Sequence, residues 1–130
     1  MIVVDSSVLL PALMDPEFSG AAAWDRLTGD SLAAPELIDI EVASGLKRLE
    51  RGHLVSPDTA VRKLAELTGF PLERFPHTPF LPRIWELRHN LSTYDASYVA
   101  LAEMLGATLL SSDRSFVEAP GIGCPVELLA

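Results

Sequence analysis

The chain has few cysteines, few aromatic residues and no long apolar run, and each shortage excludes a class of protein. The single cysteine, Cys124, excludes an internal disulfide framework and is consistent with a reducing, cytoplasmic location. No apolar stretch approaches the roughly 20 residues that a transmembrane helix requires, so we expect no membrane contact. The N-terminus also lacks the basic segment and the small-residue cleavage site of a signal peptide.

Positive charge is scarce as well, because only 10 Lys and Arg residues stand against 18 Asp and Glu residues. The formal net charge of −8 repels a polyanion and therefore disfavours a general nucleic-acid-binding protein. Bound divalent cations, or a locally basic rim, would overcome this repulsion. The charge balance thus leaves room for a metal-dependent enzyme.

Apolar residues make up 48% of the 130 residues, which is enough for a well-filled core. Helical patterns alternate with short apolar runs, and we find no repeat, low-complexity segment or internal boundary. This alternation predicts one α/β domain that covers residues 1–130.

The opening residues, MIVVDSSVLL, give the clearest signal for the fold. Ile2–Val4 is an unbroken β-favouring run, typical of a strand that is covered on both faces in the middle of a parallel sheet. Asp5 follows directly, at the edge where open α/β folds place their ligands. A simpler alternative is that Asp5, Ser6 or Ser7 caps the next helix.

Periodic apolar positions predict the helices that follow. One covers residues 8–14, with Pro11 tolerated only in its first turn, and the next covers residues 17–27. Pro35 is expected at the first position of a long helix that Gly52 closes. Later helices are expected to begin near Ser56, Thr78 and Ser92. Further strands are expected at residues 31–33, 107–110 and 70–75, the last at a sheet edge because it contains Pro71.

Two acids, Asp39 and Glu41, lie on the long helix. Its core face is defined by Ile38, Val42 and Leu46, and at about 100° per residue the two acids fall on opposite flanks of that face. Glu41 has no cation at its helical neighbours, so its half-buried carboxylate must find a partner elsewhere or stay uncharged. Periodicity alone does not say which of the two acids is functional.

The stretch LSTYDASYVALAEMLGATLLSSD supplies two more acids. Asp95 lies near the start of a helix, and Asp113 follows the apolar run 107–110 much as Asp5 follows the first strand. Both have simpler explanations, because Ser92 and Asp95 have the spacing of a capping box and Asp113 would cap the turn after it.

Taken together, these acids lie at strand ends or on helix faces that can converge on one edge of a parallel sheet. Four carboxylates repel one another, so a protein that collects them usually has cations to hold them. Carboxylate oxygens without His or Cys nearby select Mg²⁺ or Mn²⁺. Two such ions activate water and stabilise the leaving oxygen of a phosphodiester.

The chain resembles the PIN-domain ribonucleases of the VapC toxin type. The resemblance rests on IVVDSSVLL, PELIDIEVASGLKR and STYDASYVALAEMLGATLLSSD, which occur in the family's order over a chain of matching length. The segment YDASYVALAE is the most specific of them. The resemblance implies a PIN-like three-layer α/β/α fold with a central parallel sheet in the order 3-2-1-4-5.

The same resemblance implies an acidic quartet, which consists of Asp5, Glu41, Asp95 and Asp113, and so prefers Glu41 to Asp39. It also implies functional hydroxyls at Ser6, after the first acid, and at Ser111, two residues before the last. Asp5, Asp95 and Asp113 would hold the Mg²⁺ or Mn²⁺, while Glu41 would contribute to a second ion or orient the attacking water. Ser6 and Ser111 would hydrogen-bond the ligands or the substrate phosphate.

The implied reaction is hydrolysis of RNA by a metal-activated water, which leaves 5′-phosphate and 3′-hydroxyl ends. The implied partners are the RNA substrate, a second copy of the chain and a VapB-like antitoxin whose tail obstructs the site. Solvated surface charge is the simpler explanation for any one of the candidate phosphate contacts. These candidates are Arg114, Lys47, Arg48 and Arg51.

Other classes remain as alternatives. A PIN fold that has lost catalysis and binds RNA or protein is the strongest rival, and the complete quartet argues against it. A phosphoacceptor receiver domain is disfavoured because Ser6 and Ser7 follow Asp5 where an acidic pair is needed, and because Lys63 is the last lysine. Phosphatases with Asp-x-Asp after the first strand fail because Ser7 occupies the second acidic position.

Overall fold

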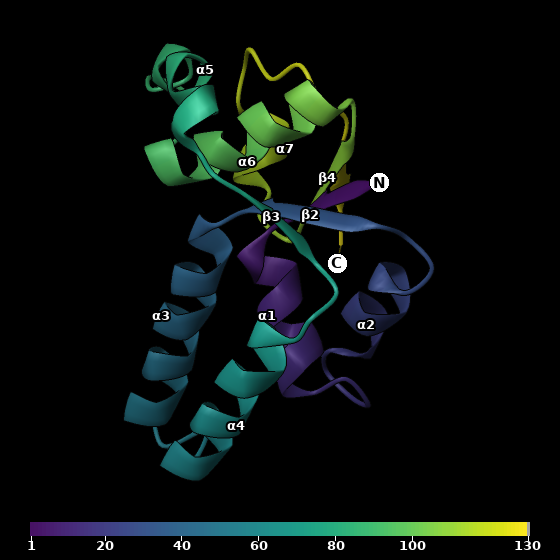
Figure 1. Cartoon of the computed structure of the whole chain (residues 1–130), viewed down its shortest axis with the longest axis vertical. Helices are drawn as coiled ribbons and strands as arrows, with labels where there is room; N and C mark the ends of the chain where they lie inside the picture. The colour runs from purple at the N-terminus through teal and green to yellow at the C-terminus, as the bar shows by residue number, and fades with distance from the viewer. Residues whose placement is uncertain (130) are drawn as a thin grey trace.

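The computed structural model describes residues 1–129 and contains a five-stranded parallel sheet between two groups of helices (Figure 1). The strand order is β3-β2-β1-β4-β5, which confirms the expected order and places the first strand in the centre. The strands are β1 (Ile2–Val4), β2 (Leu32–Pro35), β3 (Glu73–Phe75), β4 (Thr108–Ser111) and β5 (Val126–Leu128).

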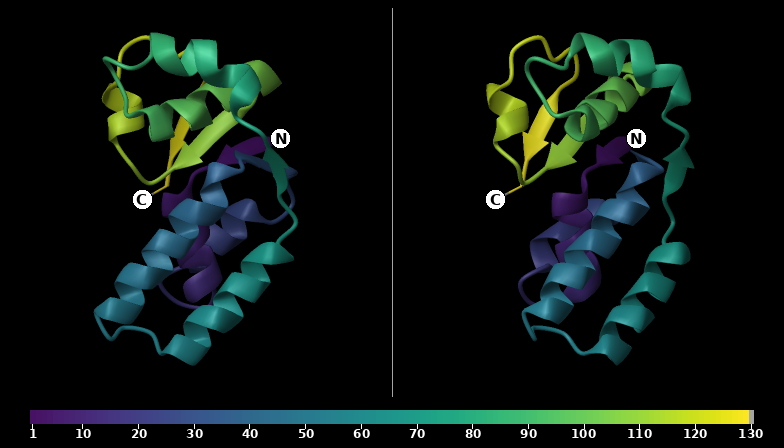
Figure 2. Two further views of the ribbon diagram at one scale, coloured as in Figure 1. Left: turned by 60° about the vertical axis from the view of Figure 1, so that its left-hand side comes forward. Right: turned by 90° about the vertical axis from the view of Figure 1, so that its left-hand side faces the viewer.

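Helices α1 to α4 lie on one side of the sheet and α5 to α7 lie on the other, so the three-layer arrangement is confirmed (Figures 1 and 2). The α3–α4 hairpin extends well beyond the sheet (Figure 2). None of the helices within residues 1–129 has the length and apolarity needed to span a bilayer. The helices are α1 (Ser6–Met14), α2 (Ala21–Leu27), α3 (Leu37–Arg51), α4 (Pro57–Thr68), α5 (Leu81–Glu86), preceded by the 3₁₀ turn η1 (Thr78–Phe80), α6 (Thr93–Leu105) and α7 (Ser115–Glu118).

The core is centred on β1, whose three residues are all buried. Helix α6 packs across β1, β2 and β4 on one face of the sheet, while α1 packs against β4 on the other. A strand covered on both faces has no polar side to present, which is why the run Ile2–Val4 shows no alternation.

Helix α1 begins at Ser6, so Pro11 lies in its interior and the prediction that Pro11 lies in the first turn is wrong. A proline inside a helix costs about 3 kcal/mol, because its ring removes a hydrogen bond and crowds the preceding turn. Val8 and Leu9 are fully buried, and burial stabilises each such side chain by about 1.5–3 kcal/mol. The helix ends soon after the proline, at Met14.

Helix α2 begins at Ala21, four residues later than predicted. The Asp15 carboxylate accepts hydrogen bonds from the backbone N–H and the hydroxyl of Ser19, which holds the preceding segment in a turn. Gly20 then approaches α1 so closely that a Cβ there would clash with the carbonyl oxygen of Pro11. The helix starts late because this tertiary contact, invisible in the local sequence, fixes the turn.

Pro35 is the last residue of β2 and pairs with Phe75, so its predicted place at the start of the long helix is also wrong. Helix α3 begins at Leu37, and the backbone N–H of Glu36 donates to the carbonyl of Phe75 at 2.9 Å. The edge position of β3, expected from Pro71, is confirmed.

The predicted helix ends are confirmed where a capping residue in the local sequence determines them. Ser56 accepts a hydrogen bond from the backbone N–H of Thr59 at the start of α4, and Ser92 accepts one from Asp95 at the start of α6. Gly106 closes α6 in the left-handed conformation, with φ of 62°.

Candidate active site

The acidic quartet comes from four separate elements at the carboxyl end of the sheet. Asp5 follows β1 directly, and Asp113 follows β4 two residues after its end, while Glu41 lies near the start of α3 and Asp95 near the start of α6. Strands β1 and β4 are parallel neighbours, and the backbone N–H of Asp5 donates to the carbonyl of Leu110 at 3.0 Å. The first and last acids of the quartet are therefore held on adjacent strand ends.

Asp95 shows that the quartet acts as one electrostatic site. The pKa of Asp95 is raised to about 6, chiefly by burial and then by the negative charges of Asp5, Asp113 and Glu41, in that order. A carboxylate beside three like charges is disfavoured in its ionised form. Asp95 is thus close enough to the other three acids to be influenced by each of them.

Glu41 is half-buried and accepts a hydrogen bond from Tyr98, a residue for which the sequence pattern indicates only a place in the core. Burial raises the pKa of Glu41, and the charge of Asp5 adds to the effect, while a hydrogen bond from Tyr98 opposes it. The Tyr98 hydroxyl donates to Glu41 Oε1 at 2.5 Å, and the Tyr98 side chain is fully buried. The hydroxyl of a buried tyrosine needs a hydrogen-bond partner. A tyrosine on the core face of a helix is therefore the sequence signal that a polar residue, here Glu41, lies nearby.

Asp39 has a different environment on the opposite flank of α3. Arg74 of β3 places its Nε 2.9 Å from both carboxylate oxygens of Asp39. The same guanidinium donates to the carbonyl oxygens of Leu67 and Leu72, at 2.7 and 3.3 Å. Asp39 is therefore neutralised in an ion pair that ties α3 to the edge strand, whereas Glu41 faces the other acids.

Asp5 is buried, with 5% of its surface exposed, and is held by serine hydroxyls. Ser7 and Ser111 both donate to its Oδ2 at 2.7 Å, while the Ser6 hydroxyl lies 3.5 Å from Oδ1. Ser111 is fully buried and also accepts a hydrogen bond from the backbone N–H of Asp113 at 2.9 Å. Nothing in the sequence pattern assigns Ser7 a role beyond capping the helix.

Asp113 and Arg114 lie together at the start of α7. The Asp113 carboxylate accepts a hydrogen bond from the backbone N–H of Ser115 at 2.9 Å, so the simple capping role expected for it is present as well. Arg114 is exposed beside it and precedes the helix. An exposed cation next to the site remains available for an anionic substrate.

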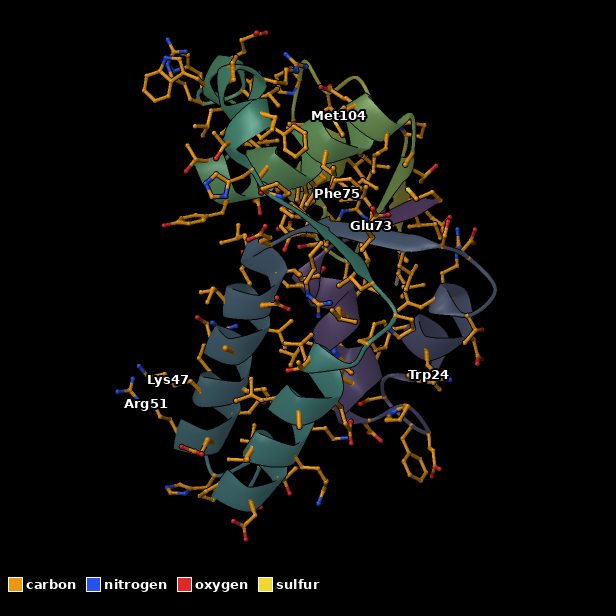
Figure 3. All side chains as sticks on the ribbon, in the orientation of Figure 1. Trp24, Lys47, Arg51, Glu73, Phe75 and Met104 are labelled. Atoms are coloured by element: carbon orange, nitrogen blue, oxygen red, sulfur yellow. The ribbon has the colours of Figure 1, made fainter. Side chains whose placement is uncertain are left out.

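The three basic residues of α3 differ in where they lie. Arg48 lines a groove of about 330 Å³ together with Ser6 and Glu41. Lys47 and Arg51 project from the outer side of the helix, away from the sheet (Figure 3). Of these three candidate phosphate contacts, only Arg48 borders the groove beside the acids.

The donor set of the quartet consists of carboxylate oxygens, which are hard ligands of the kind that Mg²⁺ and Mn²⁺ prefer. Within residues 1–129, no three Asp, Glu, His or Cys side chains lie close enough together to form a ready-made metal cluster. The negative charges of the other three acids contribute to the raised pKa of Asp95, second to its burial, so the four carboxylates repel one another in the absence of a cation. The charge and chemistry of the residues fit a divalent cation that would draw them together.

We expect Asp95→Asn to raise the Tm of the metal-free protein near pH 7.5 by about 4 °C. A pKa raised to about 6 means that ionised Asp95 destabilises the folded state. The corresponding gain is about 1 kcal/mol, a figure reduced because Asp95 is only partly buried and solvent screens its charge. Scanning calorimetry in EDTA measures it.

The pH dependence of that difference follows from the direction of the shift. Because the pKa of Asp95 is higher in the folded state, wild-type stability from this residue is complete below about pH 4 and is lost as the pH rises through 6. The advantage of Asp95→Asn should therefore vanish near pH 4. Asp25→Asn, at an exposed acid of α2, is the control. A variant advantage that is the same at both pH values would contradict a raised pKa for Asp95 in the folded protein.

Comparison with known protein families agrees with this fold. The family model described as "PIN domain" matches residues 2–122 of the chain. The match covers the β1, α3, α6 and β4 segments that carry the acids, and it places the fold in the PIN class.

Curated relatives of similar length show which branch of the PIN-domain family the chain belongs to. Ribonuclease VapC9 of Mycobacterium tuberculosis is 37% identical over 129 residues, which cover 99% of this chain and 98% of the relative. Ribonuclease VapC1 of the same organism is 35% identical over 128 residues, with 98% and 96% covered. The chain therefore belongs to the VapC ribonuclease branch of the PIN-domain family.

Solved structures show the same fold. One is VapBC2 from Rickettsia felis bound to a DNA fragment from its promoter, which matches with a TM-score of 0.73 at 16% identity over the whole of both chains. Another is M. tuberculosis VapC20, described as a sarcin-ricin loop cleaving toxin, with a TM-score of 0.68 at 17% identity over 91% of this chain and 94% of that one. At such identities the likeness concerns the fold alone.

Proposed function

We propose that the protein is a metal-dependent endoribonuclease that acts as the toxin of a toxin–antitoxin pair. The observation that carries this proposal is the convergence of four acids from four elements, whose charges, together with burial, raise the pKa of Asp95 to about 6. Four converging carboxylates destabilise the metal-free fold by mutual repulsion, and a bound cation would relieve that repulsion. The ribonuclease names of the full-length relatives support the same activity.

In this proposal Asp5, Asp95 and Asp113 would hold Mg²⁺ or Mn²⁺. The bound cation would lower the pKa of water and stabilise negative charge on the phosphodiester. Glu41, anchored through Oε1 by Tyr98, would use its other oxygen to orient the attacking water. Attack in line on phosphorus then leaves 5′-phosphate and 3′-hydroxyl ends.

A cleavage assay tests the proposal directly. Purified protein is incubated with total cellular RNA in Mg²⁺, Mn²⁺ or EDTA, and the product ends are mapped. We expect cleavage in either metal, none in EDTA, and 5′-phosphate ends. Binding of RNA without cleavage in all three conditions would instead support an inactive PIN-fold binding module.

We propose that the substrate backbone runs along the groove bordered by Arg48. Ser6 and Glu41 line the same groove, so an RNA phosphate there would lie next to the quartet. In a chain with a net charge of −8, a cation at this position has a large effect on the approach of a polyanion. Arg114, exposed beside Asp113, is the corresponding candidate on the other side of the site.

We expect Arg48→Ala to lower kcat/KM for RNA about tenfold at low salt, and to weaken the dependence of kcat/KM on salt. Arg51→Ala is the matched control, because this side chain leaves the same helix in a direction away from the sheet (Figure 3). It should change kcat/KM less than about twofold. Equal losses in the two variants would show that only overall charge matters and that the groove is not the RNA path.

We also propose that the protein is a homodimer. Large apolar side chains are exposed on α3, α5 and α6 around Leu37 and Tyr94, which border two neighbouring grooves. A second copy packed against α5 would remove Leu81 and Trp85 from water, leave the groove at Arg48 open to RNA and bring the cations of two subunits toward that groove. The exposed side chains are Ile40, Leu81, Trp85 and Tyr94. Sedimentation at micromolar concentration tests the proposal, and a monomer with full activity would contradict it.

The proposed antitoxin would inhibit by supplying a cation to the quartet. An Arg or Lys of a VapB-like antitoxin tail would pair with the carboxylates in place of a metal ion. The VapBC structure of the same fold supports such a partner. Purification from the native host is expected to recover a small bound protein that lowers metal-dependent cleavage. Repeated recovery of the chain alone would favour a nuclease without an inhibitor.

A further inference from the structure

Two serine hydroxyls, those of Ser7 and Ser111, converge on a single oxygen of Asp5. Each donates to Asp5 Oδ2 at 2.7 Å. A serine hydroxyl has one proton, so each of the two can only accept in its other contacts. The 3.3 Å approach between the two hydroxyl oxygens is therefore a consequence of their shared acceptor.

The same two hydroxyls accept hydrogen bonds from the segment that follows β4. The backbone N–H of Ser112 donates to Ser7 Oγ at 3.0 Å, and that of Asp113 donates to Ser111 Oγ at 2.9 Å. Ser7 belongs to the first turn of α1, and it is 105 residues away from Ser112 in the sequence. The hydroxyl pair thus connects the first acid of the quartet to the backbone that carries the last.

This arrangement also distinguishes the two oxygens of Asp5. Oδ2 accepts two short hydrogen bonds, whereas Oδ1 has the Ser6 hydroxyl only at 3.5 Å. Rotation of the carboxylate would break both short bonds in a residue that is 5% exposed. Oδ1 is consequently the oxygen whose lone pairs remain for a cation.

We propose that Ser7 is a positioning residue that, together with Ser111, determines which oxygen of Asp5 is presented to the cation and how far Asp113 lies from it. The inference rests on the proposed function, since it concerns the same metal site. Partners that orient a metal ligand are typically worth about 10- to 100-fold in metal affinity. A serine that merely stabilised the turn between β1 and α1 would affect folding without affecting the affinity of the folded protein.

The test is Mn²⁺ binding by isothermal titration calorimetry, with far-UV circular dichroism and Tm recorded for each protein. We expect Ser7→Ala to weaken Mn²⁺ binding about 10- to 100-fold. Ser7→Thr keeps the hydroxyl and should restore most of the affinity. Ser19→Ala is the matched control, because its hydroxyl also donates to an aspartate, Asp15, but far from the quartet. It should bind Mn²⁺ like the wild type.

Ser7→Cys keeps the inference testable if Ser7→Ala does not fold, because it fills the site of the hydroxyl with a thiol that is only a weak donor. It too should bind Mn²⁺ more weakly than the wild type. Wild-type affinity in a folded Ser7→Ala or Ser7→Cys variant would overturn the inference while leaving the proposed function intact. A wild-type protein that binds no Mn²⁺ would overturn both, because no cation would then be present for Ser7 to position.

Discussion

Asp5→Asn is expected to reduce metal-dependent RNA cleavage at least about 1,000-fold while leaving the fold intact, a loss of about 4 kcal/mol in transition-state stabilisation. Asparagine matches aspartate in shape, and its amide oxygen can still accept from Ser7 and Ser111 as Oδ2 does now. The amide nitrogen then replaces Oδ1. The substitution therefore removes the cation ligand and its charge, and retains the contacts that hold β1 to β4.

Rates on a defined RNA in Mn²⁺ measure the effect, with circular dichroism to verify folding. Asp25→Asn again serves as the control, because it removes one negative charge from an exposed position on α2. It should retain full activity. Full cleavage by Asp5→Asn, or cleavage by the wild type in excess EDTA, would contradict a metal site built on Asp5.

The parts of the fold that the sequence predicts are those decided by local patterns. The run Ile2–Val4 identifies the central strand because burial on both faces leaves no alternation, and Ser92 and Gly106 fix the ends of α6 through local chemistry. The errors at Pro11 and Pro35 have a different origin. Pro35 is paired with Phe75 of β3, a contact that no local pattern records, while α1 begins directly after Asp5 and so takes Pro11 into its interior.

Strand β5 shows where local patterns carry too little information. Its three residues, Val126–Leu128, are only partly buried and pair with β4 at the edge of the sheet. A run this short cannot be told from a loop by periodicity. Its place in the strand order is implied by the resemblance to the PIN family and is confirmed by the structure.

The residues of the candidate site likewise include some that local patterns identify and some that only distant contacts identify. Asp5 and Asp113 are recognisable because each follows a buried strand, so their position at the sheet edge follows from topology alone. The choice between Asp39 and Glu41 depends on partners 35 and 57 residues away, Arg74 and Tyr98. Such long-range pairs leave no periodic trace in the helix that carries the acids.

Those two acids permit a prediction in which activity and stability change in opposite directions. Glu41→Gln should lower kcat about 100-fold or more, because an uncharged amide would hold the attacking water more weakly than the carboxylate does. Its folding should hold, since an amide oxygen still accepts from the Tyr98 hydroxyl and the repulsion with Asp5 disappears. We therefore expect the Tm of metal-free Glu41→Gln to equal or exceed that of the wild type.

Asp39→Asn should do the reverse. It removes the charge that Arg74 contacts at 2.9 Å, which should lower stability by about 0.5–1 kcal/mol for a partly exposed pair. Activity should fall less than about tenfold, or 1.4 kcal/mol, because this carboxylate faces the edge strand. Steady-state kinetics and calorimetry on both variants give the comparison. A large loss of kcat in Asp39→Asn with near-normal kcat in Glu41→Gln would place the functional acid on the other flank of α3.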